Sequence, residues 1–163
     1  MDNKLIGEKK VYSAYLDYRN QVLKYTNEEM NLTLTSDDQV YIAVFDIPLK
    51  SGIVGNQTET LALVFGLNVH LYHGSGEVIT GLEKDEDIKK AMTSLMISAS
   101  QILSVMELTE NTEFYNSEHI RAYLKTRKGI YFRELTGNIK EDKFMGMLLN
   151  RIMKEISKAQ VNK

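Results

Sequence analysis

The residues of this sequence that could do chemistry gather around two histidines. Asn68, His70, Tyr72 and His73 follow one another closely, and Asp46 stands near the end of an earlier apolar segment. A histidine can serve as a general base near neutral pH, and a metal site built on histidines would need a further ligand such as Asp46. These five residues are therefore the candidates for a small-ligand pocket, with or without catalysis, at the polar end of a strand.

The groups that usually accompany a catalytic or metal-binding histidine are missing from the chain. It has no cysteine, no Gly-x-Ser-x-Gly pattern around a nucleophile, and only one further histidine, His119. Histidines on a sheet face beside a turn explain the pattern more simply. The sequence thus predicts no metal site, no cofactor and no catalytic residue. It favours a protein that is not an enzyme without deciding the matter.

The segment His73-Gly74-Ser75-Gly76 has the glycine content of a phosphate-binding loop. Such loops bind phosphate where they open a helix, because backbone amide hydrogens converge there. Here the segment separates two stretches that alternate like strands, and no Lys-Ser or Lys-Thr pair follows it. It therefore predicts the turn of a β-hairpin.

A run of basic residues lies towards the end of the chain. It consists of Arg121, Lys125, Arg127, Lys128 and Arg133, with Tyr123, Tyr131 and Phe132 among them. Cations beside stacking rings are typical of single-stranded nucleic-acid binding. The net charge of −2 and the flanking Glu118 and Glu134 favour a solvated face instead. Phosphate or nucleic-acid binding stays an alternative. A head-to-tail self-contact with the acidic stretches 83–87 and 107–118 is a further hypothesis.

The predicted fold is organised around the stretch from Thr60 to Gly81. Its apolar residues occupy every second position from Leu61 to Leu71, which predicts one long strand through the interior, followed by a short return strand at 77–80. A second strand, apolar on both faces, is expected from Gln39 to Leu49 and should end near the chain's single proline. The segment 51–59 reads as a loop.

Three helices are expected at 8–30, 85–107 and 140–159, where apolar residues recur at spacings of three and four. The second should begin at Asp85, whose carboxylate can cap it, and should cover one face of the sheet. The other two should share the opposite face or flank an edge. The apolar face of the third is expected to include Met147 and Arg151.

The first helix carries Tyr15, Tyr18 and Tyr25 along one stripe. Packing on the sheet is the simpler interpretation of this stripe, and a dimer interface is the sharper one, since tyrosine is enriched at interfaces.

The region after the second helix reads as an acidic connector, 107–116, followed by an ambiguous segment at 119–128. That segment fits either a helix ending at Gly129 or one strand of a hairpin with 130–135. We favour the hairpin, because the strand at 130–135 otherwise lacks an obvious partner.

These elements predict an α+β fold in a single domain, 1–163, with frayed ends at about 1–7 and 160–163. Its core would be one mostly antiparallel sheet of about five strands. The chain shows no apolar run of the ~18 residues that cross a bilayer, no secretory signal and no cysteine, so we expect a cytoplasmic protein without membrane contact. Abundant lysine and asparagine hint at a bacterial or phage origin. The leading functional hypothesis is a regulatory protein that binds a protein partner or itself as a homodimer.

Overall fold

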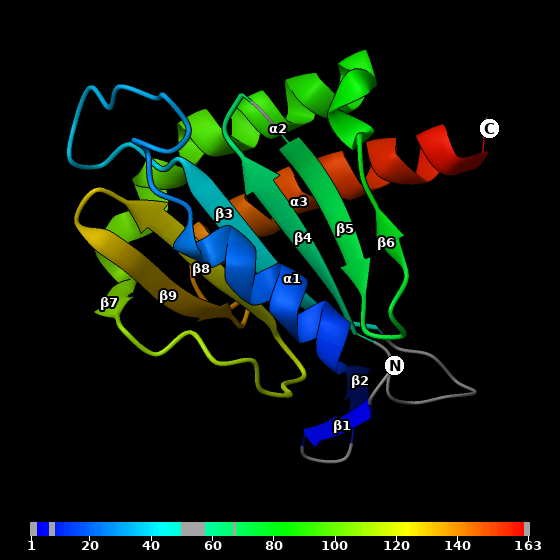
Figure 1. Ribbon diagram of the computed structural model, residues 1–163. Helices are drawn as coiled ribbons and strands as arrows, with labels where there is room; N and C mark the ends of the chain where they lie inside the picture. The colour runs from blue at the N-terminus through cyan, green and yellow to red at the C-terminus, as the bar shows by residue number, and fades with distance from the viewer. Residues whose placement is uncertain (1–2, 7–8, 50–57, 67, 162–163) are drawn as a thin grey trace.

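A seven-stranded antiparallel sheet forms the centre of the computed structural model, which describes residues 3–6, 9–49, 58–66 and 68–161 (Figure 1). The strand order is β6-β5-β4-β3-β8-β9-β7. The strands are β3 (Ile42–Pro48), β4 (Thr58–Val64), β5 (Asn68–His73), β6 (Val78–Ile79), β7 (Glu107–Thr109), β8 (Ile120–Thr126) and β9 (Gly129–Leu135). A separate two-stranded sheet pairs β1 (Asn3–Ile6) with β2 (Lys9–Tyr12). The predicted α+β class is confirmed.

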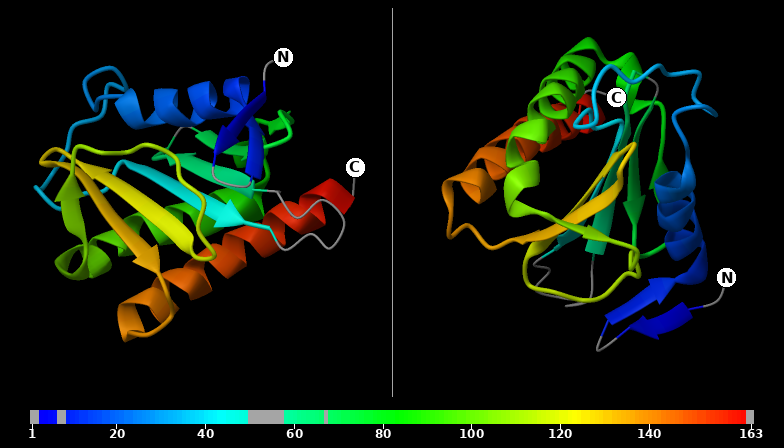
Figure 2. Two further views of the ribbon diagram at one scale, coloured as in Figure 1. Left: turned by 90° about the horizontal axis from the view of Figure 1, so that it is seen from below. Right: turned by 90° about the vertical axis from the view of Figure 1, so that its left-hand side faces the viewer.

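Helices cover both faces of the sheet (Figure 2). They are α1 (Ser13–Lys24), α2 (Glu86–Ser98) and α3 (Lys140–Val161), with the 3-10 turns η1 (Leu82–Lys84) and η2 (Ala99–Val105). α2 and α3 pack on one face together, and α1 lies on the other. The expected pairing of the first and third helices on one face is therefore wrong.

The helix bounds also differ from the prediction. The first helix, expected at 8–30, spans only Ser13–Lys24. Residues Lys9–Tyr12 form β2, and a turn follows the helix. The second helix continues past Ser98 only as η2. Asp85 caps α2 as expected, because its Oδ1 accepts hydrogen bonds from the backbone amides of Asp87 at 2.9 Å and Ile88 at 3.0 Å. In α3, Met147 and Arg151 are exposed, since the buried side of the helix is centred elsewhere, on residues such as Met145 and Leu149.

The stretch expected to form one long strand is a hairpin. β4 and β5 meet at a turn that contains Gly66, whose φ of +74° lies in the left-handed region that glycine adopts at little cost. Leu61 pairs with Leu71 and Leu63 with Val69, so these four leucine and valine side chains still share the face under α2 and α3. This split, together with β7 inside the expected acidic connector, accounts for seven strands in place of about five.

The two hairpins expected from turn chemistry are present. β5 and β6 are joined through His73 to Gly76, where the amide of Gly76 donates to the carbonyl of His73 at 2.8 Å. β8 and β9 pair antiparallel over their whole length, which decides the ambiguous segment 119–128 in favour of a strand. Of the expected loop 51–59, residues 51–57 lie outside the described part of the chain, and Thr58 and Glu59 belong to β4.

Each face of the sheet carries its own apolar core. Ala43 and Phe45 contribute to the core under α2 and α3, whereas Ile42 and Val44 contribute to the core under α1. This matches the alternation expected for a central strand covered on both sides. Within the described residues, none of the helices has the length and apolar character of a membrane span.

Candidate functional site

A row of polar side chains crosses the face of the sheet on which α1 lies. The strand register places Tyr72, Thr60, Asp46, Arg121 and Glu134 side by side on five neighbouring strands. Residues at matched register positions share a face, and all but Glu134 are buried. A polar layer therefore lies inside a core that is otherwise apolar.

Arg19, on the inner side of α1, reaches down to this row. Its Nε lies 3.0 Å from both carboxylate oxygens of Asp46, and its Nη2 donates to Oδ2 at 2.8 Å. Neither side chain is exposed. Burial alone would lower the pKa of Arg19, but the charge and hydrogen bonds of Asp46 outweigh it and raise that pKa above its ordinary value. The pair is thus a fully charged link between α1 and β3.

A second connection runs beside this ion pair. The Thr60 hydroxyl donates to Asp46 Oδ1 at 2.7 Å and is hydrogen-bonded to the Tyr15 phenol. Since the single hydroxyl proton of Thr60 goes to Asp46, Tyr15 is the donor in the other bond. Burial, reinforced by the charge of Asp46, raises the pKa of Tyr15, so the phenol keeps the proton that it donates.

Arg19 also holds the irregular segment between β7 and β8, residues 110–119, which we call the strap. Its Nη1 donates to the backbone carbonyl of Thr112 at 2.7 Å and to Asn20 Oδ1 at 2.6 Å. Its guanidinium lies 5.7 Å from the ring centre of Phe114 and 5.1 Å from that of Tyr123. One side chain therefore ties α1, β3 and the strap together.

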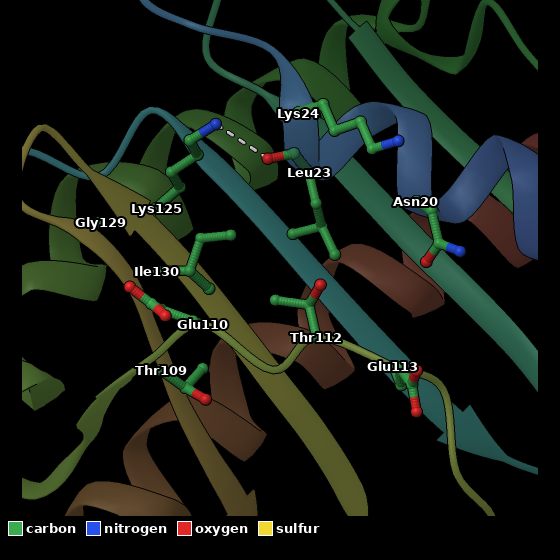
Figure 3. A pocket seen from close by; sticks show the side chains of 10 residues that line it. All are labelled: Asn20, Leu23, Lys24, Thr109, Glu110, Thr112, Glu113, Lys125, Gly129 and Ile130. Carbon is green, nitrogen blue, oxygen red and sulfur yellow. Dashed lines mark hydrogen bonds between the residues drawn. The ribbon is translucent and has the colours of Figure 1, made fainter.

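A groove of about 440 Å³ lies between α1 and the strap, with the end of the β8–β9 hairpin as its floor (Figure 3). It is lined by Asn20, Leu23, Lys24, Thr109, Glu110, Thr112, Glu113, Lys125, Gly129 and Ile130. Leu23 and Ile130 give it an apolar centre, and amide, hydroxyl and charged groups surround them. The lining therefore offers hydrogen bonds, ionic contacts through Lys24, Glu110 and Glu113, and apolar contact.

Lys125 supports one wall of this groove. Its Nζ donates to the carbonyls of Leu23 at 2.8 Å and Tyr25 at 2.6 Å, which are left open at the end of α1. Burial lowers the pKa of Lys125. The ammonium group therefore caps the helix and is not displayed as an anion site.

The five candidate ligand residues are divided between the two faces of the sheet, because His73 points to the face opposite the other four. Asp46 is taken up by Arg19, while the His70 ring stacks on Tyr72 at 5.9 Å. Asn68 stands at the start of β5, two positions before His70. His73 lies at the far end of β5 beside a small hollow of about 150 Å³.

The surroundings of His73 are acidic. Its Nδ1 is 3.6 Å from Glu59 Oε2, and its Nε2 is 3.4 Å from Glu77 Oε1. Within the described residues, no three histidine, aspartate or glutamate side chains are arranged to hold a metal ion.

The basic run does not form one surface either. Arg121 is buried with 1% of its surface exposed, and its Nη1 donates to the carbonyls of Ser117 and His119 at 3.0 Å. Arg133 points to the opposite face of the sheet, where it pairs with Asp142 at 2.7 Å.

Lys125 is the residue that caps α1, as described above. The last two residues of the run, Arg127 and Lys128, lie in the turn of the β8–β9 hairpin. Arg127 pairs with Asp37 at 2.6 Å, and Lys128 is exposed. The structural basis for nucleic-acid binding through this run is therefore weak.

The three tyrosines of the first helix have different surroundings. Tyr15 is 1% exposed and belongs to the core, whereas Tyr18 is 44% exposed and stacks on Tyr72 at 5.6 Å. Tyr25 lies just after α1 and is half-buried. An interface through this helix would use Tyr18.

Arg19 and the strap were not singled out from the sequence. The signal for Arg19 was its position, since Tyr15, Arg19 and Val22 follow at spacings of four and three on the buried stripe of α1. A charged residue on such a stripe requires a buried partner. The chain matches no protein-family model, no curated protein and no solved structure.

Proposed function

We propose that this is a non-enzymatic binding protein that acts in the cytoplasm through contact with another protein, or with a second copy of itself. The groove between α1 and the strap receives part of that partner. The observation that carries the proposal is the position of Arg19, which belongs to α1, one wall of the groove. Its side chain binds Asp46 of the sheet and Thr112 of the strap, the other wall, so that both walls are held in place. A binding surface held in place before binding loses less conformational entropy when the partner arrives.

The lining of the groove supports a protein partner. An apolar centre, formed by Leu23 and Ile130, surrounded by polar and charged groups is the usual arrangement of a protein–protein contact. The volume of about 440 Å³ can receive one or two side chains of a partner.

Site-specific photo-crosslinking tests this proposal. A benzophenone amino acid replaces Glu113, at the groove, and in a separate variant replaces Asp38, an exposed residue of the loop before β3. After irradiation in the expressing cell, we expect a discrete crosslinked protein from position 113 and none from position 38.

Two further variants show whether the groove itself is responsible. Ile130→Arg places a charge on the floor and should abolish the crosslink, whereas Ile130→Val keeps the floor apolar and should preserve it. Thermal unfolding of both variants shows that they fold. A crosslink that is missing at position 113, or unaffected by Ile130→Arg, would contradict the proposal.

A further inference from the structure

The outer side of α3 carries a stripe of basic residues. Lys140, Lys143, Met147, Arg151, Lys154 and Lys158 are all exposed, and they follow at spacings of three and four along the helix. At 1.5 Å per residue the stripe is about 27 Å long. It lies opposite the buried side of α3, which carries Met145, Leu149, Ile152 and Ile156.

Most cations of this stripe form no ion pair with the residues that the structure describes. In the described part of the chain, only Lys158 has a carboxylate within reach, that of Glu155 at 3.1 Å. Asp142, near the start of α3, is buried against Arg133 and does not pair with the stripe. Because the whole chain has a net charge of −2, the rest of the molecule is acidic.

Exposed apolar groups accompany this charge. Met147, within the stripe, is 58% exposed, and Ile97, on the outer side of the neighbouring helix α2, is 65% exposed. An apolar centre with polar and charged groups around it is the usual composition of a protein–protein contact. The stripe therefore offers a basic surface with an apolar contact point at Met147.

The strap carries the complementary features. Glu110, Glu113 and Glu118 are exposed, and Tyr115 is 36% exposed. Tyr115 therefore gives the acidic strap an apolar contact point of its own.

The two surfaces face away from each other in one molecule. Phe114 of the strap packs in the core under α1, whereas α3 packs in the core on the opposite face (Figure 2). A strap therefore cannot contact the stripe of its own chain. We propose that the basic stripe of α3 binds the strap of a second copy, so that the protein assembles head to tail.

This inference rests on the proposed function, since it names the partner and the surfaces of a protein that acts by binding. The sequence suggested that the basic run from Arg121 to Arg133 makes a self-contact with acidic stretches of another copy. Most side chains of that run bind groups of their own chain, and the stripe of α3 takes its place in the proposed contact. The contact joins two different surfaces, so each added copy leaves one of each free, and assembly continues beyond a dimer unless a ring closes.

Reciprocal charge reversal tests the contact. The stripe variant Arg151→Glu/Lys154→Glu and the strap variant Glu110→Lys/Glu113→Lys should each self-associate about tenfold or more weakly than the wild type in sedimentation velocity, because like charges then meet. Mixing the two variants should restore assembly, since each reversed surface then meets its complement. A control, Lys84→Glu/Lys128→Glu, has the same net charge as the stripe variant but alters exposed lysines elsewhere, and it should assemble like the wild type.

Salt provides an independent measurement. Raising the ionic strength from about 0.1 M to about 1 M shortens the screening length from about 10 Å to about 3 Å and should weaken the wild-type assembly. Circular dichroism and thermal unfolding show that each variant folds. A wild type that stays monomeric at every concentration would overturn the inference, and so would a mixture of variants that fails to assemble.

The outcome is distinguishable from that of the proposed function. A monomeric wild type that still crosslinks another protein from position 113 overturns the head-to-tail contact and leaves the binding role standing. A monomeric wild type that binds duplex nucleic acid or phosphatidylserine vesicles, with loss in Arg151→Glu/Lys154→Glu, assigns the stripe to that ligand and overturns the contact with a second copy.

Discussion

The guanidinium of Arg19 and the carboxylate of Asp46 meet inside the protein with neither side chain exposed to solvent. Asp46 accepts three hydrogen-bond contacts from Arg19 and one from Thr60, so its charge is well compensated. A buried ion pair of this kind carries a large desolvation cost, and it stabilises a fold chiefly by making any arrangement without the partner unfavourable. The pair therefore fixes where α1 lies on the sheet.

Removing one member of this pair should be far more damaging than removing both. Arg19→Met leaves the Asp46 carboxylate buried without a cation, which should cost about 3–5 kcal/mol of unfolding free energy. In the double variant Arg19→Met/Asp46→Leu no charge remains buried, and roughly half or more of that loss should be regained. Urea unfolding measures both, and a double variant less stable than Arg19→Met would contradict this account.

Arg19→Lys separates the two roles of the arginine. Lysine can keep one contact with Asp46, but it lacks the planar fork that reaches the Thr112 carbonyl at the same time. The strap should loosen, and the amide hydrogen of Glu113, which donates to Asn111 Oδ1 at 3.1 Å, should exchange about tenfold faster. Amides in the middle of α3 serve as the control. If exchange speeds up equally at Glu113 and in α3, the variant has lost global stability, and Arg19 has no specific effect on the strap.

The alternation of apolar residues explains why the sheet was predictable and its strand count was not. In the β4–β5 hairpin the paired residues, such as Leu61 with Leu71, are separated by an even number of positions. Odd-numbered residues therefore share one face whether the chain runs straight or turns at Gly66. The pattern gives the face of each side chain correctly, and only the glycine marks the turn.

The candidate site depends on contacts between residues distant in sequence, which no local pattern contains. Arg19 is 93 positions from Thr112, and Lys125 is 102 positions from Leu23. The stripe containing Arg19 could have been recognised as unusual, but its partner could not. In the same way the basic run from Arg121 was divided between two faces because strand residues alternate, whereas the cations of α3 share one side because their spacing is helical.

His70 should make the protein sensitive to acid. Burial lowers the pKa of His70 below its usual value near 6.5, although Glu83 opposes this, and the buried Nδ1 has no hydrogen-bond partner among the described residues. The unfolded chain therefore takes up the proton first, and this contribution to stability is present above about pH 6.5 and lost as the pH falls through the folded-state pKa. His70→Phe keeps a ring beside Tyr72 and cannot be protonated. Its unfolding free energy relative to the wild type should rise between about pH 7 and about pH 5.

Glu59 should give the unfolding free energy the opposite pH dependence, and it serves as the comparison for His70. Burial raises the pKa of Glu59, and the neighbouring His73 only partly offsets this. Its contribution is present below the unfolded-state pKa and is lost as the pH rises through the folded-state pKa. Glu59→Gln should therefore gain stability relative to the wild type as the pH rises, the reverse of His70→Phe. If both variants gained stability in the same direction of pH, one of the two assignments would be wrong.

Gly66 and Gly146 allow backbone conformation to be tested apart from packing. A Cβ added at either position would meet no atom within 4 Å, so neither substitution causes a clash. Gly146 lies inside α3, where alanine loses less conformational entropy on folding, and Gly146→Ala should raise the unfolding free energy by about 0.5–1 kcal/mol. Gly66 has a φ of +74°, and Gly66→Ala should lower it by about 1–2 kcal/mol. Urea unfolding of both variants should give opposite signs; a stabilised Gly66→Ala would mean that the β4–β5 turn does not hold this residue in the left-handed region.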